Sequence, residues 1–128
     1  MTRFLWIGLG GALGTWTRYL ISLGAARLLG ASFPFGTLLV NVTGCFLIAF
    51  IMQLAASTDL ISTTMRLTLT TGFMGGLTTY STFNYETTRY LQEHAPATAW
   101  ANFGATVVGC FVAGLLGLAS ANRLFHHP

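Results

Sequence analysis

Four stretches of this chain are apolar over the length of a membrane-crossing helix, and this feature limits the fold more than any other. They cover residues 4–23, 35–56, 67–85 and 97–121. A helix needs about 20 mostly apolar residues to cross the hydrocarbon core of a bilayer. Only 7% of the 128 residues are charged, whereas a typical soluble domain has about a quarter. We therefore predict an all-α integral membrane protein with four transmembrane helices, forming a single domain over residues 1–128.

The remaining composition excludes several classes of function. The net charge of +3 comes from scattered arginines without a basic run, so nucleic-acid binding is not expected, and no soluble protein partner is evident. An apolar run after Arg3 is compatible with a signal peptide, but the rest of the chain is equally apolar. We expect a permanent first span and a multi-pass protein of the bacterial inner (plasma) membrane, surrounded by lipid.

Reactive side chains are few and scattered. Cys45 and Cys110 both fall inside apolar stretches and are expected to be reduced and buried. The histidines lie in loops or at the end of the chain, where His126, His127 and Pro128 are expected to form a tail rather than a ligand set. No nucleophile, base and orienting group share one face, so an enzyme is not expected.

The arginines give no preferred orientation in the membrane. With four spans, the termini and the middle loop share one side, with Arg3, Arg66 and Arg123. The other side has Arg27 and Arg89, with Arg18 snorkelling toward it. Because the positive-inside rule depends on an excess on one side, both orientations can insert. An antiparallel two-fold homodimer then becomes possible.

The third apolar stretch contains a sequence that is unfavourable for a continuous helix. From Gly72 to Phe83 it reads Gly-Phe-Met-Gly-Gly-Leu-Thr-Thr-Tyr-Ser-Thr-Phe. Adjacent glycines weaken a helix through their backbone entropy. Non-helical backbone at membrane depth is tolerated only where protein buries it or where it lines a wet cavity. A broken third helix is therefore predicted, with a binding or permeation site beside it.

Small residues four positions apart occur in three of the predicted helices. The pairs are Gly10 with Gly14, Gly72 with Gly76, and Ala113 with Gly117. Such pairs let two helices approach closely. They favour contacts between subunits or ordinary packing within one bundle, and the sequence leaves both open.

Polar residues within the predicted spans are almost all neutral. Thr37 and Asn41 share one helix face, and a second stripe follows the fourth span at Asn102, Thr106 and Cys110. Neutral donors can replace water around a small anion without trapping it, and aromatic ring edges can face it. Threonine and serine also commonly bond their own helix carbonyls. Asn41 is the strongest candidate, because an unpartnered amide in hydrocarbon is costly.

Three blocks of the sequence resemble the Fluc (CrcB) family of fluoride channels over nearly the whole chain. The first is Gly10-Gly-Ala-Leu-Gly14 followed by Arg18-Tyr19. The second is Gly36-Thr-Leu with Asn41 and Gly44, and the third, the most specific, runs from Gly75 to Phe83. The resemblance implies a dual-topology antiparallel homodimer of four-helix subunits with two pores, which exports fluoride passively.

The resemblance also implies roles for individual residues. The fluoride pore would be lined by Thr37, Asn41, Tyr80, Ser81, Thr82, Phe83, Asn102, Thr106 and Cys110. Arg18 would lie near the aqueous entrance, and Glu86 would fall at a pore-side position. A structural sodium ion on the dimer axis would be held by the backbone carbonyls of Gly75 and Thr78 from both subunits.

Tyr80 departs from the family pattern, which has phenylalanine at this position. Its added hydroxyl could bond fluoride, bond a neighbour or narrow the path, so the conduction rate is the property in question. Two other classes of function are also compatible with four apolar spans. A proton-coupled exporter of the small multidrug resistance kind needs a carboxylate within the membrane. The only candidate is Glu86, which lies at the end of a predicted span rather than inside it. Only general hydrophobicity favours a non-transporting assembly subunit.

Overall fold

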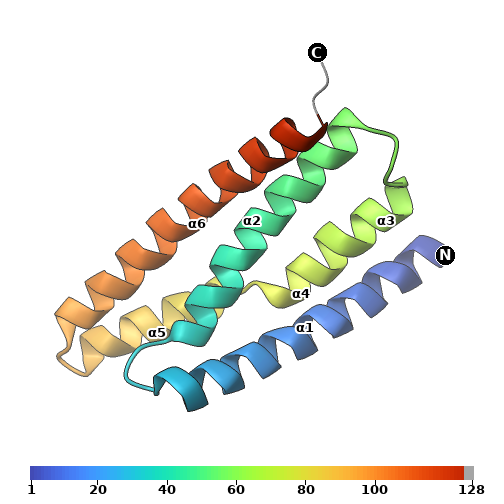
Figure 1. Ribbon diagram of the computed structural model, residues 1–128. Coiled ribbons are helices and arrows are strands. Elements are labelled where there is room, and N and C mark those ends of the chain that lie inside the picture. Colours follow the sequence, from blue (N-terminus) through green and yellow to red (C-terminus); the bar gives the residue numbers. More distant parts are fainter. Residues whose placement is uncertain (126–128) are drawn as a thin grey trace.

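The computed structural model describes residues 1–125, and all of its regular structure is helical. The elements in chain order are α1 (Thr2–Leu29), α2 (Phe35–Ser57), α3 (Thr63–Leu67), the π-helix η1 (Thr68–Met74), α4 (Gly75–Leu77), α5 (Tyr80–Gln92) and α6 (Pro96–Phe125) (Figure 1). The expected tail, His126 to Pro128, lies outside the described residues. The prediction of an all-α fold with a broken third helix is confirmed.

Two of the described helices, α2 and α6, are long and apolar enough to cross a membrane. The 28-residue α1 has the length but is not among them, and the third crossing is divided among α3, η1, α4 and α5. α1 also continues to Leu29, so the loop expected to begin at Gly24 is much shorter. Gly30, with φ of 83°, ends the helix in a conformation that favours glycine.

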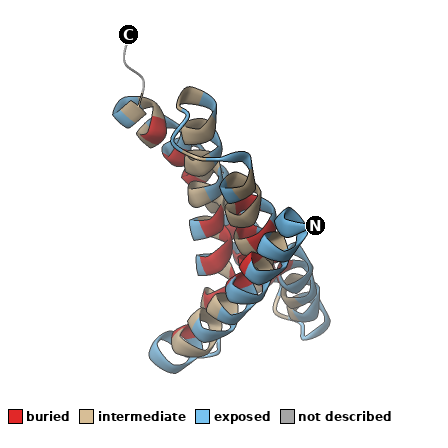
Figure 2. Cartoon of the chain, turned by 90° about the vertical axis from the view of Figure 1, so that its right-hand side faces the viewer, coloured by how far each residue is buried: buried red, intermediate tan, exposed pale blue. Residues whose placement is uncertain are grey.

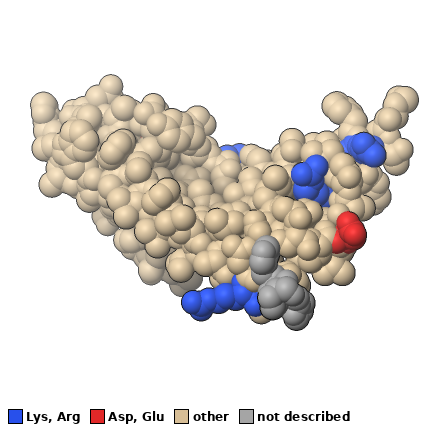
Figure 3. Space-filling view, turned by 90° about the horizontal axis from the view of Figure 1, so that it is seen from above, with Lys and Arg blue, Asp and Glu red and all other residues tan. Residues whose placement is uncertain are grey.

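α1, α2, the third crossing and α6 run alternately up and down. The N-terminus, the connection from α2 to α3 and the C-terminal end of α6 lie toward one end of the molecule in Figure 1, and the other two connections lie at the opposite end. This is the arrangement expected for four crossings. Figure 3 shows a surface with only a few charged side chains, most of them away from its centre.

Glycines bring α1 into backbone contact with the first half of the third crossing. A Cβ atom on Gly14 would lie 2.1 Å from the carbonyl oxygen of Phe73, and one on Gly76 would lie 2.3 Å from that of Gly11. Gly117 approaches α2 in the same way, at 2.2 Å from the carbonyl oxygen of Phe46. The three small-residue pairs therefore serve packing within one chain, and they give no support to a contact between subunits.

The buried core is thin, and much of the apolar surface faces outward. Val40, Met74 and Leu77 form a buried cluster where α2 meets the third crossing. Large apolar side chains elsewhere are exposed, among them Trp16 and Phe111. Figure 2 shows buried residues concentrated where the helices face one another, with exposed residues on the outer sides. Such a surface suits lipid or a second chain rather than water.

Candidate functional site

The third crossing is interrupted at two threonines. α4 ends at Leu77, and Thr78 (φ −82°, ψ 156°) and Thr79 (φ −154°, ψ 108°) are extended before α5 begins at Tyr80. The break therefore lies within the predicted stretch Gly72 to Phe83, at its hydroxyl residues, whereas the glycines that were expected to weaken the helix are themselves helical. Their physical role is different, because Gly72 and Gly76 are where the backbone of α1 approaches most closely.

Asn41 on α2 holds the interruption by two hydrogen bonds to one residue. Its Nδ2 donates to the carbonyl oxygen of Thr79 at 3.0 Å, and its Oδ1 accepts from the Thr79 N–H at 2.7 Å. The side chain is buried, with 7% exposed. Thr79 is therefore the protein partner of an amide whose burial without a partner would be costly, and a role of Asn41 in a fluoride path stays a prediction. A primary amide has two N–H groups, so one donor remains beyond the one given to Thr79.

These bonds change what the neighbouring carbonyls can do. In a continuous helix the Thr79 N–H would bond the carbonyl of Gly75, and the Thr82 N–H would bond that of Thr78. Instead Thr79 donates to Asn41, and Thr82 donates to the Thr79 hydroxyl at 3.2 Å. The carbonyls of Gly75 and Thr78 thus lose their helical donors. Oxygen atoms freed in this way are suitable ligands for a hard cation.

The Thr79 hydroxyl caps the start of α5. The hydroxyl groups of Ser81 and Thr82, which follow it, lie close to this cap. The Thr79 hydroxyl donates to Thr82 Oγ1 at 2.9 Å and lies 3.3 Å from Ser81 Oγ. Ser81 and Thr82 are exposed on the outside of the chain. Neither lines the cavity beside the break, so the structure does not bring these two predicted pore residues to it.

A cavity of about 410 Å³ opens beside the break, between α2, the third crossing and α6. It gathers most of the residues expected there, namely Asn41, Gly75, Thr78, Tyr80, Phe83, Thr106 and Cys110. The rest of its lining is Gly44, Cys45, Ile48, Thr70, Met74 and Val107. Every side chain in this set is uncharged.

Aromatic rings form one side of this cavity. Phe83 is nearly fully buried, at 2% exposed, whereas Tyr80 is 76% exposed. The two rings meet edge to face with centroids 5.5 Å apart, and Phe83 also lies 6.2 Å from Phe103 on α6. The buried ring is therefore fixed from two sides, while the tyrosine ring is largely exposed at the edge of the cavity.

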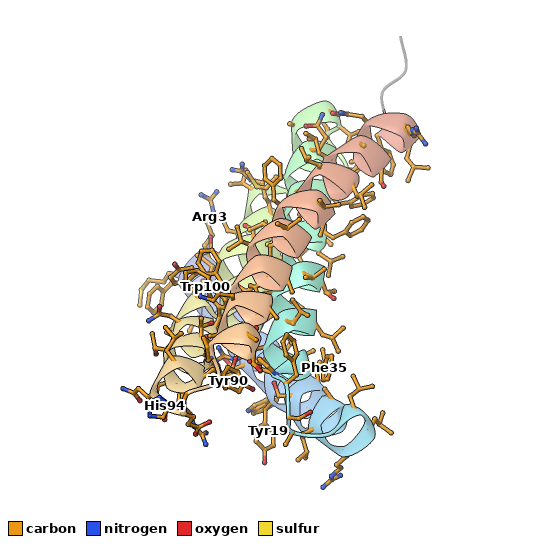
Figure 4. All side chains as sticks on the ribbon, turned by 90° about the vertical axis from the view of Figure 1, so that its left-hand side faces the viewer. Arg3, Tyr19, Phe35, Tyr90, His94 and Trp100 are labelled. Atoms are coloured by element: carbon orange, nitrogen blue, oxygen red, sulfur yellow. The ribbon has the colours of Figure 1, made fainter. Side chains whose placement is uncertain are left out.

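A second cavity, of about 240 Å³, lies toward the end where α1 joins α2. Here the Thr37 hydroxyl donates to Glu86 Oε1 at 2.8 Å, and Glu86 Oε2 is buried without a partner in the described chain. Tyr90 lines it together with Phe35, and both are labelled in Figure 4. The arginine in its wall is Arg89, not Arg18, so the structure does not place Arg18 at this cavity.

A short polar track on α6 lies between the second half of the third crossing and the first cavity. Asn102 Nδ2 donates to the Thr87 hydroxyl at 2.8 Å, and that hydroxyl donates to the Phe83 carbonyl at 2.8 Å. Asn102 Oδ1 and Thr106 Oγ1 are buried without partners among residues 1–125. Buried polar atoms of this kind need an explanation, such as water or a bound ion.

The family model described as "CrcB-like protein, Camphor Resistance (CrcB)" matches residues 5–118. The chain belongs to the CrcB family. Members of this family include proteins named fluoride-specific ion channel FluC from Sorangium cellulosum (strain So ce56), at 52% identity over 124 residues, and from Anaeromyxobacter sp. (strain K), at 51% over 113 residues. The alignments cover 97% of this chain and 98% of the first relative, and 88% and 90% for the second.

A third CrcB relative, the fluoride-specific ion channel FluC of Geobacter sulfurreducens, is 46% identical over 124 residues, which cover 97% of this chain and 100% of the relative. Membership establishes the chain as a multi-pass membrane protein of an ion-channel family rather than an enzyme.

Three residues at the site of this CrcB chain were not predicted from the sequence. Phe103 follows Asn102 directly and carries no periodic signal, so only the packing of α5 on α6 reveals its contact with Phe83. Cys45 and Met74 have ordinary apolar surroundings in the sequence, yet both line the first cavity. Their positions depend on how three separate helices meet, which no local pattern encodes.

Proposed function

We propose that the protein is a passive fluoride-specific ion channel, as its relatives are named. The observation that supports this most directly is the first cavity, whose lining has no charged side chain. The remaining N–H of Asn41 and the unpaired Thr106 hydroxyl supply donors for a small anion. Neutral donors replace hydration without holding the ion so tightly that it cannot leave.

The proposed path joins the two cavities. An ion would enter beside Thr37 and Glu86, pass Asn102 and Thr106, and reach the first cavity beside Phe83. The Phe83 ring is held edge to face against Tyr80, and a ring edge carries the positive part of the aromatic quadrupole. Ser81, Thr82 and Arg18 line neither cavity, and they would contribute from a face that a second chain completes.

We further propose that the channel is an antiparallel homodimer in which two chains complete each path. Three arginines at each end of the subunit allow both orientations. The 76% exposed Tyr80 ring lies beside the cavity and leaves room for a partner there. In the same proposal, residues 1–128 form one channel domain in the inner membrane.

The break also fits a structural sodium ion on the dimer axis. The carbonyls of Gly75 and Thr78 lose their helical donors to Asn41 and to the α5 cap, and both residues line the open cavity. Bound there from two chains, sodium would supply positive charge that offsets the partial negative charge of the converging carbonyls. These residues orient the oxygens, and Asn41 keeps them free.

Efflux from liposomes tests the channel assignment. Purified protein is reconstituted into vesicles loaded with potassium fluoride or potassium chloride, and release is followed with ion-selective electrodes after valinomycin addition. Fluoride release that needs the protein, with chloride retained, is the expected result. Equal release of both anions, or none of either, rejects the proposal. Protein-free vesicles provide the control for leakage.

One observation favours a second candidate, a proton-coupled exporter. The carboxylate of Glu86 is partly buried, with one oxygen unpaired in the described chain, and coupled exporters use a carboxylate within the membrane. Glu86→Gln separates the two functions. It should abolish transport driven by a pH gradient in an exporter, and it should leave passive, voltage-driven fluoride flux measurable in a channel.

A further inference from the structure

Two thiols and a thioether share the wall of the first cavity. Cys45 lies on α2, Cys110 on α6 and Met74 at the end of η1, and all three line the same space of about 410 Å³. The chain has only two cysteines, and both are free and partly exposed. The donors proposed for the anion are the Asn41 N–H and the Thr106 hydroxyl, and a thiol is a weaker hydrogen-bond donor than either.

Cys45 and Cys110 line one cavity from α2 and α6, two helices that pack against each other. Gly114, four positions after Cys110 and so on the same face of α6, approaches the backbone of Cys45. Glycines on α6 allow this approach on both sides of Cys110. A Cβ atom on Gly109 would lie 3.2 Å from Val42 Cγ2, and one on Gly114 would lie 3.9 Å from the Cys45 carbonyl oxygen.

We propose that Cys45 and Cys110 form a binding site for a soft metal ion of low coordination number, with mercury(II) as the best-fitting ion. Thiolate and thioether sulfur select soft metals over hard ones. On binding, each thiol gives its proton to water and forms one metal–sulfur bond. Two thiolates neutralise a divalent ion, and a neutral complex avoids the cost of placing charge in an apolar cavity.

The ligand set also distinguishes among metals. Zinc is almost always four-coordinate in structural sites, whereas the described part of the chain has no group of three or more histidine, cysteine or acidic side chains that could hold a metal. Mercury(II) is satisfied by two thiolates, and Met74 is available as a weak third ligand. Because the site lies in the wall of the cavity, an occupied site should also obstruct anion passage, a consequence that rests on the proposed function.

Binding is tested on the whole protein in detergent, without reference to transport. Mercury(II) is added in steps, and the thiols that remain reactive are counted after unfolding with a chromogenic disulfide reagent. One equivalent per chain should protect both thiols. Cys45→Ser and Cys110→Ser should each hold the ion roughly 100-fold less tightly against a competing small thiol, because only the pair chelates. Zinc should protect neither thiol.

Several results overturn the site. They are single variants that retain mercury as tightly as the parent, two equivalents bound per chain, or one equivalent bridging two chains, seen by mass spectrometry under native conditions. The double variant, with serine at both positions, is free of thiols and serves as the control. Fluoride efflux of each protein is compared with and without mercury: mercury should stop efflux by the parent and should leave the rate of this variant at its own mercury-free value. Binding without block refutes the obstruction alone, and absence of any fluoride efflux refutes the proposed function while the binding result stands.

Discussion

Replacing Asn41 with alanine should destabilise the break more than any other single truncation of a polar side chain near it. The substitution removes the acceptor of the Thr79 N–H and the donor to the Thr79 carbonyl, bonds of 2.7 and 3.0 Å. Thr79 is buried, at 7% exposed, so water does not readily replace either bond. Each orphaned buried group costs about 1–3 kcal/mol, which gives a loss of about 2–6 kcal/mol.

A loss of this size is measurable as a free energy of unfolding. Unfolding by a denaturing detergent in mixed micelles, followed by far-ultraviolet circular dichroism, should show a smaller unfolding free energy for Asn41→Ala. Hydrogen exchange should speed up at Thr79 and in the first turn of α5, since the clamp fixes both. A loss of even 2 kcal/mol corresponds to about a 30-fold change in the unfolding equilibrium.

Asn102→Ala is the matched control, because it truncates the same residue type at 1% exposure. Asn102 makes its hydrogen bond to the Thr87 hydroxyl, which keeps its own bond to the Phe83 carbonyl, and its Oδ1 is already unpaired. We expect a loss of about 1 kcal/mol or less. Equal losses for the two variants, or unchanged exchange at Thr79 in Asn41→Ala, would refute the clamp.

Three further outcomes follow from the packing and the cavity. Gly14→Ala, whose Cβ would meet the Phe73 carbonyl oxygen at 2.1 Å, should cost about 1–3 kcal/mol in the same unfolding assay, whereas Gly8→Ala, with open space around it, should not destabilise. Phe83→Ile should slow fluoride efflux roughly fivefold through loss of an interaction of about 1 kcal/mol, with an unchanged dimer by size-exclusion chromatography; full-rate flux refutes the aromatic assignment. Thr106→Val should reduce efflux and Thr106→Ser should retain it, because serine keeps the unpaired hydroxyl; equal rates exclude that hydroxyl from the path.

The sequence predicts the helices well because their signals are local. Long apolar stretches give α2 and α6 nearly at their observed limits, and Pro96 begins α6 as a helix-starting proline should. The end of α1 was placed too early, at residue 23. Nothing between Gly24 and Leu29 stops a helix, since a single glycine is tolerated, and only Gly30 takes a positive φ.

The break was predicted correctly within Gly72 to Phe83, but the glycines of that stretch are not where the helix opens. Gly75 and Gly76 weaken a helix intrinsically, yet both remain helical because α1 packs against Gly76. Thr78 and Thr79 carry no strong breaking signal. They become extended because Asn41, distant in the sequence, takes the hydrogen bonds of Thr79. A contact between separate helices thus decides a local conformation, and local sequence does not contain it.

The same amide connects the two ions that the proposed function requires. Asn41 Oδ1 takes the Thr79 N–H and so leaves the Gly75 carbonyl without its helical donor, while one Asn41 N–H remains for the cavity. A cation held by the freed carbonyls would favour the extended form of the break, and the extended form keeps the amide aimed at the anion. Sodium occupancy and fluoride entry should therefore depend on one side chain. Aspartate at this position keeps the acceptor and loses the donors, so Asn41→Asp should preserve the cation site better than it preserves fluoride flux.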